Sequence, residues 1–237
     1  MVAADASLLS FLIVAIDTVI FDLDGVLLET EQEWNDVRRE FAAEHGGHWD
    51  EYDQPAVMGA NSMQWAEYMR EKVGVHLSPQ EIYDGVIDGL RARYAQHLPI
   101  IPGAREAVIA LAARFHLGVA SSSPIELIEH SLELAQLRRY FGTLVSSDQV
   151  AVGKPAPDVY LEACSRLGTV PSRAVAIEDS SNGLRAAAAA GLAVIAVPNP
   201  AFPPSPEALS LADIVIGSVA EVTGDMIASI RGEAVRG

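Results

Sequence analysis

The sequence predicts an α/β fold in which a doubly wound, mostly parallel sheet carries an inserted α-helical cap domain. Short apolar runs of strand length alternate with helical patterns through most of the chain, which is typical of a parallel sheet covered on both faces. Three of these apolar runs end directly in acidic or hydroxyl residues. Because residues 31–98 contain only helical patterns, we assign 1–30 and 99–237 to the α/β core and 31–98 to the cap.

The first strand and the first cap helix follow from the residue pattern. An apolar run over 16–23 predicts a buried strand. The next segment, 31–45, is charged, but Trp34 and Phe41 lie two helical turns apart on one apolar stripe, which predicts an amphipathic helix. The glycine pair at 46–47 ends this helix, because glycine disfavours a helical interior.

Two further helices complete the expected cap. A helix over 61–73 begins at Asn61 or Ser62, either of which can act as its N-cap. A helix over 79–97 begins with a Ser-Pro pair, in which the serine is the N-cap and the proline the first helical residue. No strand is expected before the chain returns to the core near residue 98.

The second half of the chain alternates strands and helices regularly. The proline-rich segment 198–206 is expected to be a loop, and Gly191 ends an alanine-rich helix. The expected elements are helices at 104–114, 125–136, 156–167 and 182–190, and strands at 117–122, 143–146, 174–179, 193–197 and 214–216.

Composition narrows the possible partners and location of the protein. The chain has 237 residues, half of them hydrophobic, and a formal net charge of −16. Such an acidic surface repels nucleic acids and anionic membranes, so we expect neither as a partner. The single cysteine, Cys164, excludes an internal disulfide, and the apolar stretch Leu8–Ile16 lacks the flanks of a signal peptide and the length of a membrane span. We therefore expect a cytoplasmic protein; the sequence predicts no particular oligomeric state.

Acids, serines and a lysine gather where strands of the sheet end. They are Asp22 and Asp24 after the first strand, Ser121 and Ser122 after the second core strand, Lys154 at the start of a helix, and Glu178 and Asp179 after a third strand. Parallel strands present their carboxyl ends at one edge of a sheet, where open α/β folds bind ligands. These side chains are therefore expected to share one crevice.

The chemistry of these side chains favours a magnesium site beside a phosphate site. Four carboxylates brought together unpaired would repel one another, and a hard divalent cation with oxygen ligands resolves that conflict. Lys154 offers a compact positive charge to a phosphate oxygen, and a serine hydroxyl such as that of Ser121 can donate to another. The backbone amides after Asp22, which include that of Leu23, are candidates for an anion-binding concavity.

Four sequence strings, taken together, resemble the motifs of the haloacid dehalogenase-like hydrolase superfamily. They are Asp-Leu-Asp-Gly-Val-Leu at 22–27, the serine at 121, Gly-Lys-Pro-Ala-Pro-Asp at 153–158 and Ile-Glu-Asp-Ser-Ser-Asn-Gly at 177–183. The resemblance runs from about residue 16 to 216, and the helical insert resembles the small cap of the phosphatase and β-phosphoglucomutase-like branch. It implies a Rossmann-like core.

The resemblance also implies a role for each matching residue. Asp22 is the nucleophile that becomes an aspartyl-phosphate, and Asp24 is the general acid and then the general base, with its backbone carbonyl on the metal. Ser121 and Lys154 hold the phosphate, with Ser122 and the Leu23 amide as further contacts. Asp179 and Glu178 hold Mg²⁺ together with Asp22.

The expected substrate is a small phosphorylated metabolite, such as a sugar phosphate, which the enzyme hydrolyses. Asn61, Trp65, Glu29 and Arg185 are the candidate substrate contacts. A β-phosphoglucomutase-like mutase is the alternative. Mutases of this family carry an arginine shortly after a cap glycine, and the matching stretch here, Gly-Ala-Asn-Ser-Met at 59–63, has none, which favours hydrolysis.

Three other functions are less consistent with the sequence. A true haloacid dehalogenase works without metal and does not need the Asp24 carboxylate. A phosphonate-cleaving relative needs a Schiff-base lysine in the cap, and the setting of Lys72 does not match. A phospho-aspartate signalling module, as in response-regulator receivers, uses similar residues but has about half this length and no helical insert.

Overall fold

The computed structural model describes residues 15–57 and 60–230, and its centre is a six-stranded sheet. The strand order is β3-β2-β1-β4-β5-β6, and all five pairings are parallel. The strands are β1 (Thr18–Phe21), β2 (His116–Ser121), β3 (Phe141–Ser146), β4 (Ala174–Glu178), β5 (Ala193–Ala196) and β6 (Ile214–Val215). The chain winds from β1 to one side and from β4 to the other, so the prediction of a doubly wound α/β fold is confirmed and the switch point lies between β1 and β4.

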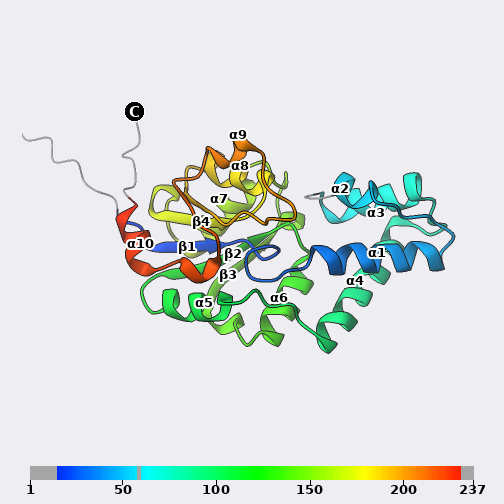
Figure 1. Ribbon diagram of the computed structural model, residues 1–237, viewed down its shortest axis with the longest axis horizontal. Coiled ribbons are helices and arrows are strands. Elements are labelled where there is room, and N and C mark those ends of the chain that lie inside the picture. Colours follow the sequence, from blue (N-terminus) through cyan, green and yellow to red (C-terminus); the bar gives the residue numbers. More distant parts are fainter. Residues whose placement is uncertain (1–14, 58–59, 231–237) are drawn as a thin grey trace, which may run out of the picture.

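Helices cover both faces of the sheet (Figure 1). Along β1, Val19 and Phe21 enter the apolar cluster on one face and Ile20 enters the cluster on the other, as the two-residue period of a strand requires. One face carries α5 (Ala104–Ala112), α6 (Ile125–Leu134) and α10 (Gly224–Ser229), and the other carries α7 (Asp158–Leu167), α8 (Ser181–Ala189) and α9 (Pro206–Leu209).

The cap consists of helices that pack around an apolar cluster of their own and lie beyond one end of the sheet (Figure 1). They are α1 (Glu31–Glu44), α2 (Asp53–Val57), α3 (Ser62–Tyr68), the π-helical turn Met69–Val73 and α4 (Pro79–Gln96). Asn61 and Ser78 cap α3 and α4 through capping boxes, as their positions in the sequence predict. The cluster is rich in tryptophan: Trp34, Trp49 and Trp65 all lie within it.

Several element boundaries differ from those that the sequence predicts. The first strand ends at Phe21, so Asp22 and Leu23 already belong to the following turn. Helix α7 begins at Asp158 and not at 156, because two prolines precede it and favour a turn. The short helices α2, α9 and α10 were not predicted, since four to six residues are too few for a periodic signal.

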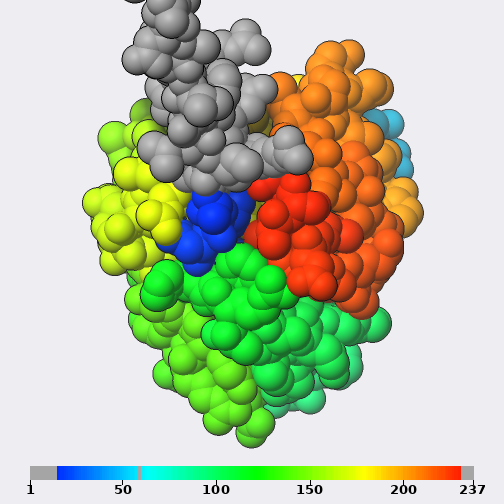
Figure 2. All heavy atoms as spheres, turned by 90° about the vertical axis from the view of Figure 1, so that its left-hand side faces the viewer, coloured from blue at the N-terminus to red at the C-terminus, as the bar shows by residue number. Residues whose placement is uncertain are grey.

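The end of the molecule opposite the cap holds the amino ends of the strands. Figure 2 faces this end and shows the start of β1 between α5 and α10. Asp17 links the neighbouring strands there, because its N–H donates to Arg173 and its carbonyl accepts from His116. The carboxyl ends of the strands therefore face the cap. The segment Leu8–Ile16 lies almost entirely outside the described residues, and no helix within them has the length and apolarity to cross a membrane.

Candidate functional site

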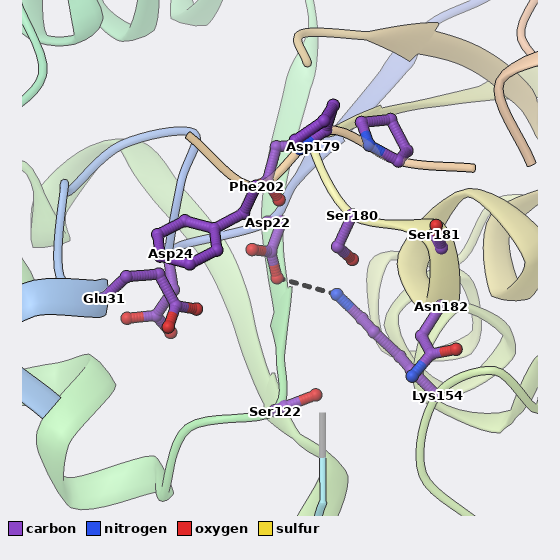
Figure 3. Close-up of a pocket in the computed structure, with 12 residues that line it drawn as sticks. Asp22, Asp24, Glu31, Ser122, Lys154, Asp179, Ser180, Ser181, Asn182 and Phe202 are labelled. Atoms are coloured by element: carbon purple, nitrogen blue, oxygen red, sulfur yellow. Dashed lines mark hydrogen bonds and ion pairs between the residues drawn. The ribbon is translucent and has the colours of Figure 1, made fainter. Parts of the chain in front are cut away.

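A cavity of about 360 Å³ lies at the carboxyl ends of the strands, between the core and the cap. Most of the predicted chemistry-bearing residues meet in it (Figure 3). Its lining consists of Asp22, Asp24, Glu31, Ser122, Lys154, Asp179, Ser180, Ser181, Asn182, Phe202, Pro203 and Pro204. Asp24 and Glu31 lie on one side of Asp22, and Lys154 lies on the other (Figure 3).

The turn after β1 requires glycine at position 25. Gly25 has a φ of +83°, and a Cβ there would lie 2.0 Å from the Asp179 carboxylate. The carbonyl of Leu23 accepts from the amides of Leu27 and Leu28, which closes the turn. The Leu23 N–H itself has no hydrogen-bond partner within the described residues.

Lys154 is the central cation of the core site. Its Nζ donates to Asp22 Oδ1 at 2.7 Å, to Glu178 Oε1 at 2.6 Å and to the carbonyl of Ala120 at 2.9 Å. These bonds use all three donors of the ammonium group. The lysine side chain is 4% exposed, so the protein holds it in one position at the end of the sheet.

Glu178 is completely buried and saturated with hydrogen bonds. Its Oε1 accepts from Lys154 and from the Tyr160 hydroxyl at 2.8 Å, and its Oε2 accepts from the amides of Asp179 and Ser180 and from the Ser180 hydroxyl. A carboxylate accepts about four hydrogen bonds. Glu178 therefore acts here as an anchor for Lys154 and for the turn that carries Asp179.

The Asp24 carboxylate is held by hydroxyl groups. Thr30 and Ser123 donate to its two oxygens, and Ser121 donates at 3.2 Å. The hydroxyl of Ser121 also accepts from the Ser123 amide, and its side chain is fully buried. Ser122 is the serine of this group that lines the cavity. The structure thus brings Asp24 next to Asp22 but directs the two carboxylates to different partners.

Burial and crowding raise the pKa of the acids in this site. Burial raises the pKa of Asp22 to about 8 against the opposing effect of Lys154, and Glu178 and Asp24 raise it further. Burial also raises the pKa of Asp179 well above its usual value, with the charges of Glu178 and Asp22 adding to the effect. Burial alone would lower the pKa of Lys154, but the two carboxylates it contacts outweigh burial and raise it. One cation is therefore too little for the negative charge gathered here.

Three of these acids fit a divalent cation. Carboxylate oxygens of Asp22, Glu178 and Asp179 lie within 4.8 Å of one another. Hard oxygen donors of this kind suit Mg²⁺. The raised pKa values of Asp22 and Asp179 indicate that Lys154 does not fully compensate the negative charge of the group. Because the hydrogen bonds of Glu178 are already taken, Asp22 and Asp179 are the better ligands. The Asp24 side chain lies outside this group.

A second, smaller cavity of about 80 Å³ adjoins the first on the side of the cap. Asp24, Glu31 and Ser122 line both cavities. The further lining residues of the second are Trp34, Arg38, Gln54, Val57, Ala60, Trp65 and Ser123. Of the predicted substrate contacts, Trp65 is found here.

The other three predicted substrate contacts lie elsewhere. The Asn61 side chain caps α3. Glu29 accepts from Asn199 at 3.2 Å and lines a separate cavity behind the β1 turn. Arg185 donates to Ser205 at 3.1 Å and lines neither of the two adjoining cavities.

Sequence reasoning missed several lining residues of these cavities, four of which bear on the chemistry or the substrate. Glu31, Arg38 and Gln54 come from the cap, and Phe202 comes from the proline-rich loop. Figure 3 shows Glu31 and Phe202. Arg38 alone left a signal: it stands four residues after Trp34, on the apolar stripe of α1, where a charged residue is unusual. No local sequence pattern marks Glu31, Gln54 or Phe202, because these residues reach the cavities only through the packing of segments that are distant in sequence.

Comparison with known proteins gives consistent matches. The family described as haloacid dehalogenase-like hydrolase matches residues 16–191. Hexitol phosphatase B from Escherichia coli is 33% identical over 208 residues, which cover 86% of this chain and 93% of that protein. The phosphorylated carbohydrates phosphatase of Thermotoga maritima is 32% identical over 74% of this chain and 82% of its own length. The crystal structure of CbbY from Rhodobacter sphaeroides in complex with phosphate superposes with a TM-score of 0.81 at 30% identity, covering 91% of this chain and all of that one.

Proposed function

Because this chain belongs to the haloacid dehalogenase-like hydrolases, we propose that it is a phosphatase that acts on a small phosphorylated sugar or sugar alcohol through an aspartyl-phosphate intermediate. The names of its relatives, a hexitol phosphatase and a phosphorylated carbohydrates phosphatase, support the substrate class. The observation that carries the proposal is the contact of Lys154 with Asp22 at 2.7 Å, at the floor of a cavity large enough for a sugar phosphate.

In the first step, a carboxylate oxygen of Asp22 attacks the phosphorus atom of the substrate. The bond from phosphorus to the ester oxygen breaks, and Asp24 gives its proton to that oxygen as the alcohol leaves. Lys154 stays protonated and neutralises charge on the transferring oxygens, and Ser122, which lines the cavity, and the Leu23 amide are the proposed donors to the other oxygens.

In the second step, water attacks the phosphorus atom of the aspartyl-phosphate. Asp24 accepts the proton of that water, and the bond to Asp22 breaks and restores the free carboxylate. Thr30 and Ser123 keep the Asp24 carboxylate in one orientation for both transfers. A residue that serves first as acid and then as base needs such fixed positioning.

We further propose that Mg²⁺ is held by Asp22, Asp179 and the backbone carbonyl of Asp24. Glu178 contributes indirectly, because it accepts hydrogen bonds from Lys154 and from the amides of the turn that carries Asp179. When bound, the ion supplies positive charge that lets an anionic nucleophile approach an anionic phosphate. Lys154 alone does not balance Asp22, Glu178 and Asp179, which supports the assignment.

The proposal is tested by measuring phosphate release from a panel of sugar and sugar alcohol phosphates with and without Mg²⁺. We expect turnover that depends on the metal and needs no sugar bisphosphate as activator. Strict dependence on such an activator would indicate a mutase, and autophosphorylation without turnover would indicate a signalling module. Asp22→Asn should lower kcat on the order of 10⁴-fold or more without changing the circular dichroism spectrum; near wild-type activity would refute the nucleophile assignment.

A further inference from the structure

Arg38 is a buried cation on the cap side of the site, and the mechanism above does not use it. It projects from α1, has 5% of its surface exposed and lines the smaller cavity. Three indole rings surround its guanidinium: the centroids of Trp34, Trp65 and Trp49 lie 4.4, 5.0 and 6.0 Å from Cζ. An aromatic box of this kind favours a cation and holds it in place.

Most N–H donors of the Arg38 guanidinium have no acceptor within the described residues. Within the described residues, its guanidinium donates only from Nη1 to the side-chain oxygen of Gln54, at 3.0 Å. Its Nε is buried without a partner, and no carboxylate of the described residues lies within ion-pair distance. Guanidinium has five N–H donors in a planar fork that matches an oxyanion. Because a buried N–H group without an acceptor is costly, an arginine in this state indicates a ligand that accepts from its remaining donors.

The position of Arg38 relative to the phosphate site indicates that its ligand is a group of the substrate itself. The cavity that Arg38 lines shares Asp24, Glu31 and Ser122 with the cavity that holds Asp22 and Lys154. A substrate with its phosphate at Lys154 therefore extends past Asp24 towards the guanidinium. Its far end then occupies the small cavity, whose volume of about 80 Å³ suits a compact group.

We infer that Arg38 binds a second anionic group at the end of the substrate opposite the transferred phosphate, so that the preferred substrate is a phosphorylated sugar acid or a sugar bisphosphate. This inference rests on the proposed phosphatase function and specifies its substrate. A carboxylate and a phosphate share the oxyanion geometry that the fork of Arg38 recognises, and the experiment below separates them.

The acidic neighbours of Arg38 are compatible with an anion. Glu31 is bonded to Gln54 at 2.9 Å, so that a chain of hydrogen bonds runs from Arg38 through the amide to this carboxyl group. Burial raises the pKa of Glu31, which favours its neutral form beside a bound anion. Burial lowers the pKa of Arg38 to about 10, so it is still a cation at neutral pH.

The experiment compares three esters that differ only at the far end: a hexitol 6-phosphate, the corresponding aldonic acid 6-phosphate and the hexitol 1,6-bisphosphate. We expect kcat/KM to be at least about tenfold higher for one anionic ester than for the neutral one, and the better of the two identifies the group. Arg38→Met should lower this ratio by about 10–100-fold, the effect of a charged hydrogen bond. Arg38→Lys should restore part of it, since the charge returns without the fork.

Controls separate the failure of this inference from that of the proposed function. Arg70→Met, which removes an exposed arginine of the same cap, should leave the ratio unchanged. Calorimetric binding of the three esters to the Asp22→Asn variant, with and without Arg38→Met, gives an affinity ratio that does not depend on turnover. Equal kcat/KM values for neutral and anionic esters in the wild type would overturn the inference and leave the phosphatase intact. If no ester is turned over, the phosphatase proposal fails, and equal affinities in calorimetry would overturn the inference as well.

Discussion

Lys154 in the core and Arg38 in the cap are both buried cations beside one crevice, yet their surroundings differ. Lys154 has three donors and three acceptors, two of which are carboxylates. Arg38 has five donors and one amide acceptor within the described residues. The core cation is thus completed by the protein itself, whereas the cap cation is enclosed by indole rings and left with donors to spare.

This difference separates two functions of a buried charge. A cation whose donors are all taken by protein groups fixes the geometry of those groups, and here it positions Asp22, the proposed nucleophile. A cation with spare donors in a cavity recognises a ligand. Under the proposed function, the core residues carry out the chemistry and the cap residues determine selectivity, so that the cap can change without disturbing Asp22 or Lys154.

The largest effect is expected from removing the core cation. Lys154→Met leaves the carboxylates of Asp22 and Glu178 buried and unpaired, so it should lower the free energy of unfolding by about 3–5 kcal/mol and kcat by roughly 10²–10³-fold. Arg38→Met leaves no carboxylate unpaired and should change stability by less than about 2 kcal/mol. Urea unfolding and phosphate-release kinetics measure both. Equal losses of stability in the two variants would contradict the distinction drawn between Lys154 and Arg38.

Substitutions of the neighbouring acids Glu178 and Asp179 should differ in their effects on Mg²⁺ binding and on stability. Asp179→Asn removes a proposed metal ligand and should weaken Mg²⁺ binding by about 100-fold, with little loss of stability. Glu178→Gln turns an acceptor into a donor that faces Lys154, Tyr160 or the amides of the turn, so it should destabilise the fold and weaken Mg²⁺ by about tenfold or less. Magnesium titration of turnover, alongside thermal unfolding, checks this. The reverse order would make Glu178 the principal ligand.

The raised pKa of Asp22 predicts how stability depends on pH when no metal is bound. The folded protein holds a proton on Asp22 up to about pH 8, whereas the unfolded chain releases it near pH 4, so stability is greatest below pH 4 with respect to this group and declines as pH rises from 4 to 8. Asp179 acts in the same direction. Thermal unfolding in a chelator should show Tm falling over this range.

Two further measurements make this pH test specific. Magnesium should flatten the decline of Tm, because the ion compensates the carboxylates in their charged form. Asp22→Asn in chelator should flatten it as well, with Tm changing by roughly 2–4 °C for each kcal/mol. A Tm that rises from pH 5 to 8 without metal would show that Lys154 outweighs burial at Asp22.

The contrast between core and cap also explains how much the sequence could predict. Asp22 and Asp179 directly follow strands, and Lys154 lies in the turn that precedes α7. The order of elements alone brings such positions together at one edge of the sheet. The predicted contacts Asn61, Glu29 and Arg185 lie outside both adjoining cavities, because which face of a helix or loop meets the crevice depends on tertiary packing. The only sequence signal of Arg38 is that a charged residue stands on the apolar stripe of α1.

The smallest expected effect concerns Tyr160, which helps to complete the core cation only indirectly. Its hydroxyl donates to Glu178 Oε1, the same oxygen that accepts from Lys154. Tyr160→Phe removes one of five donors from Glu178 and keeps the ring that packs beside Lys154, so stability should fall by about 1 kcal/mol and kcat by no more than a fewfold. Because the remaining donors still hold the carboxylate, KM and the preference among esters should not move. A loss of activity as large as that of Lys154→Met would mean that the lysine is not fixed by its own three bonds, and the distinction between a completed and an open cation would fail.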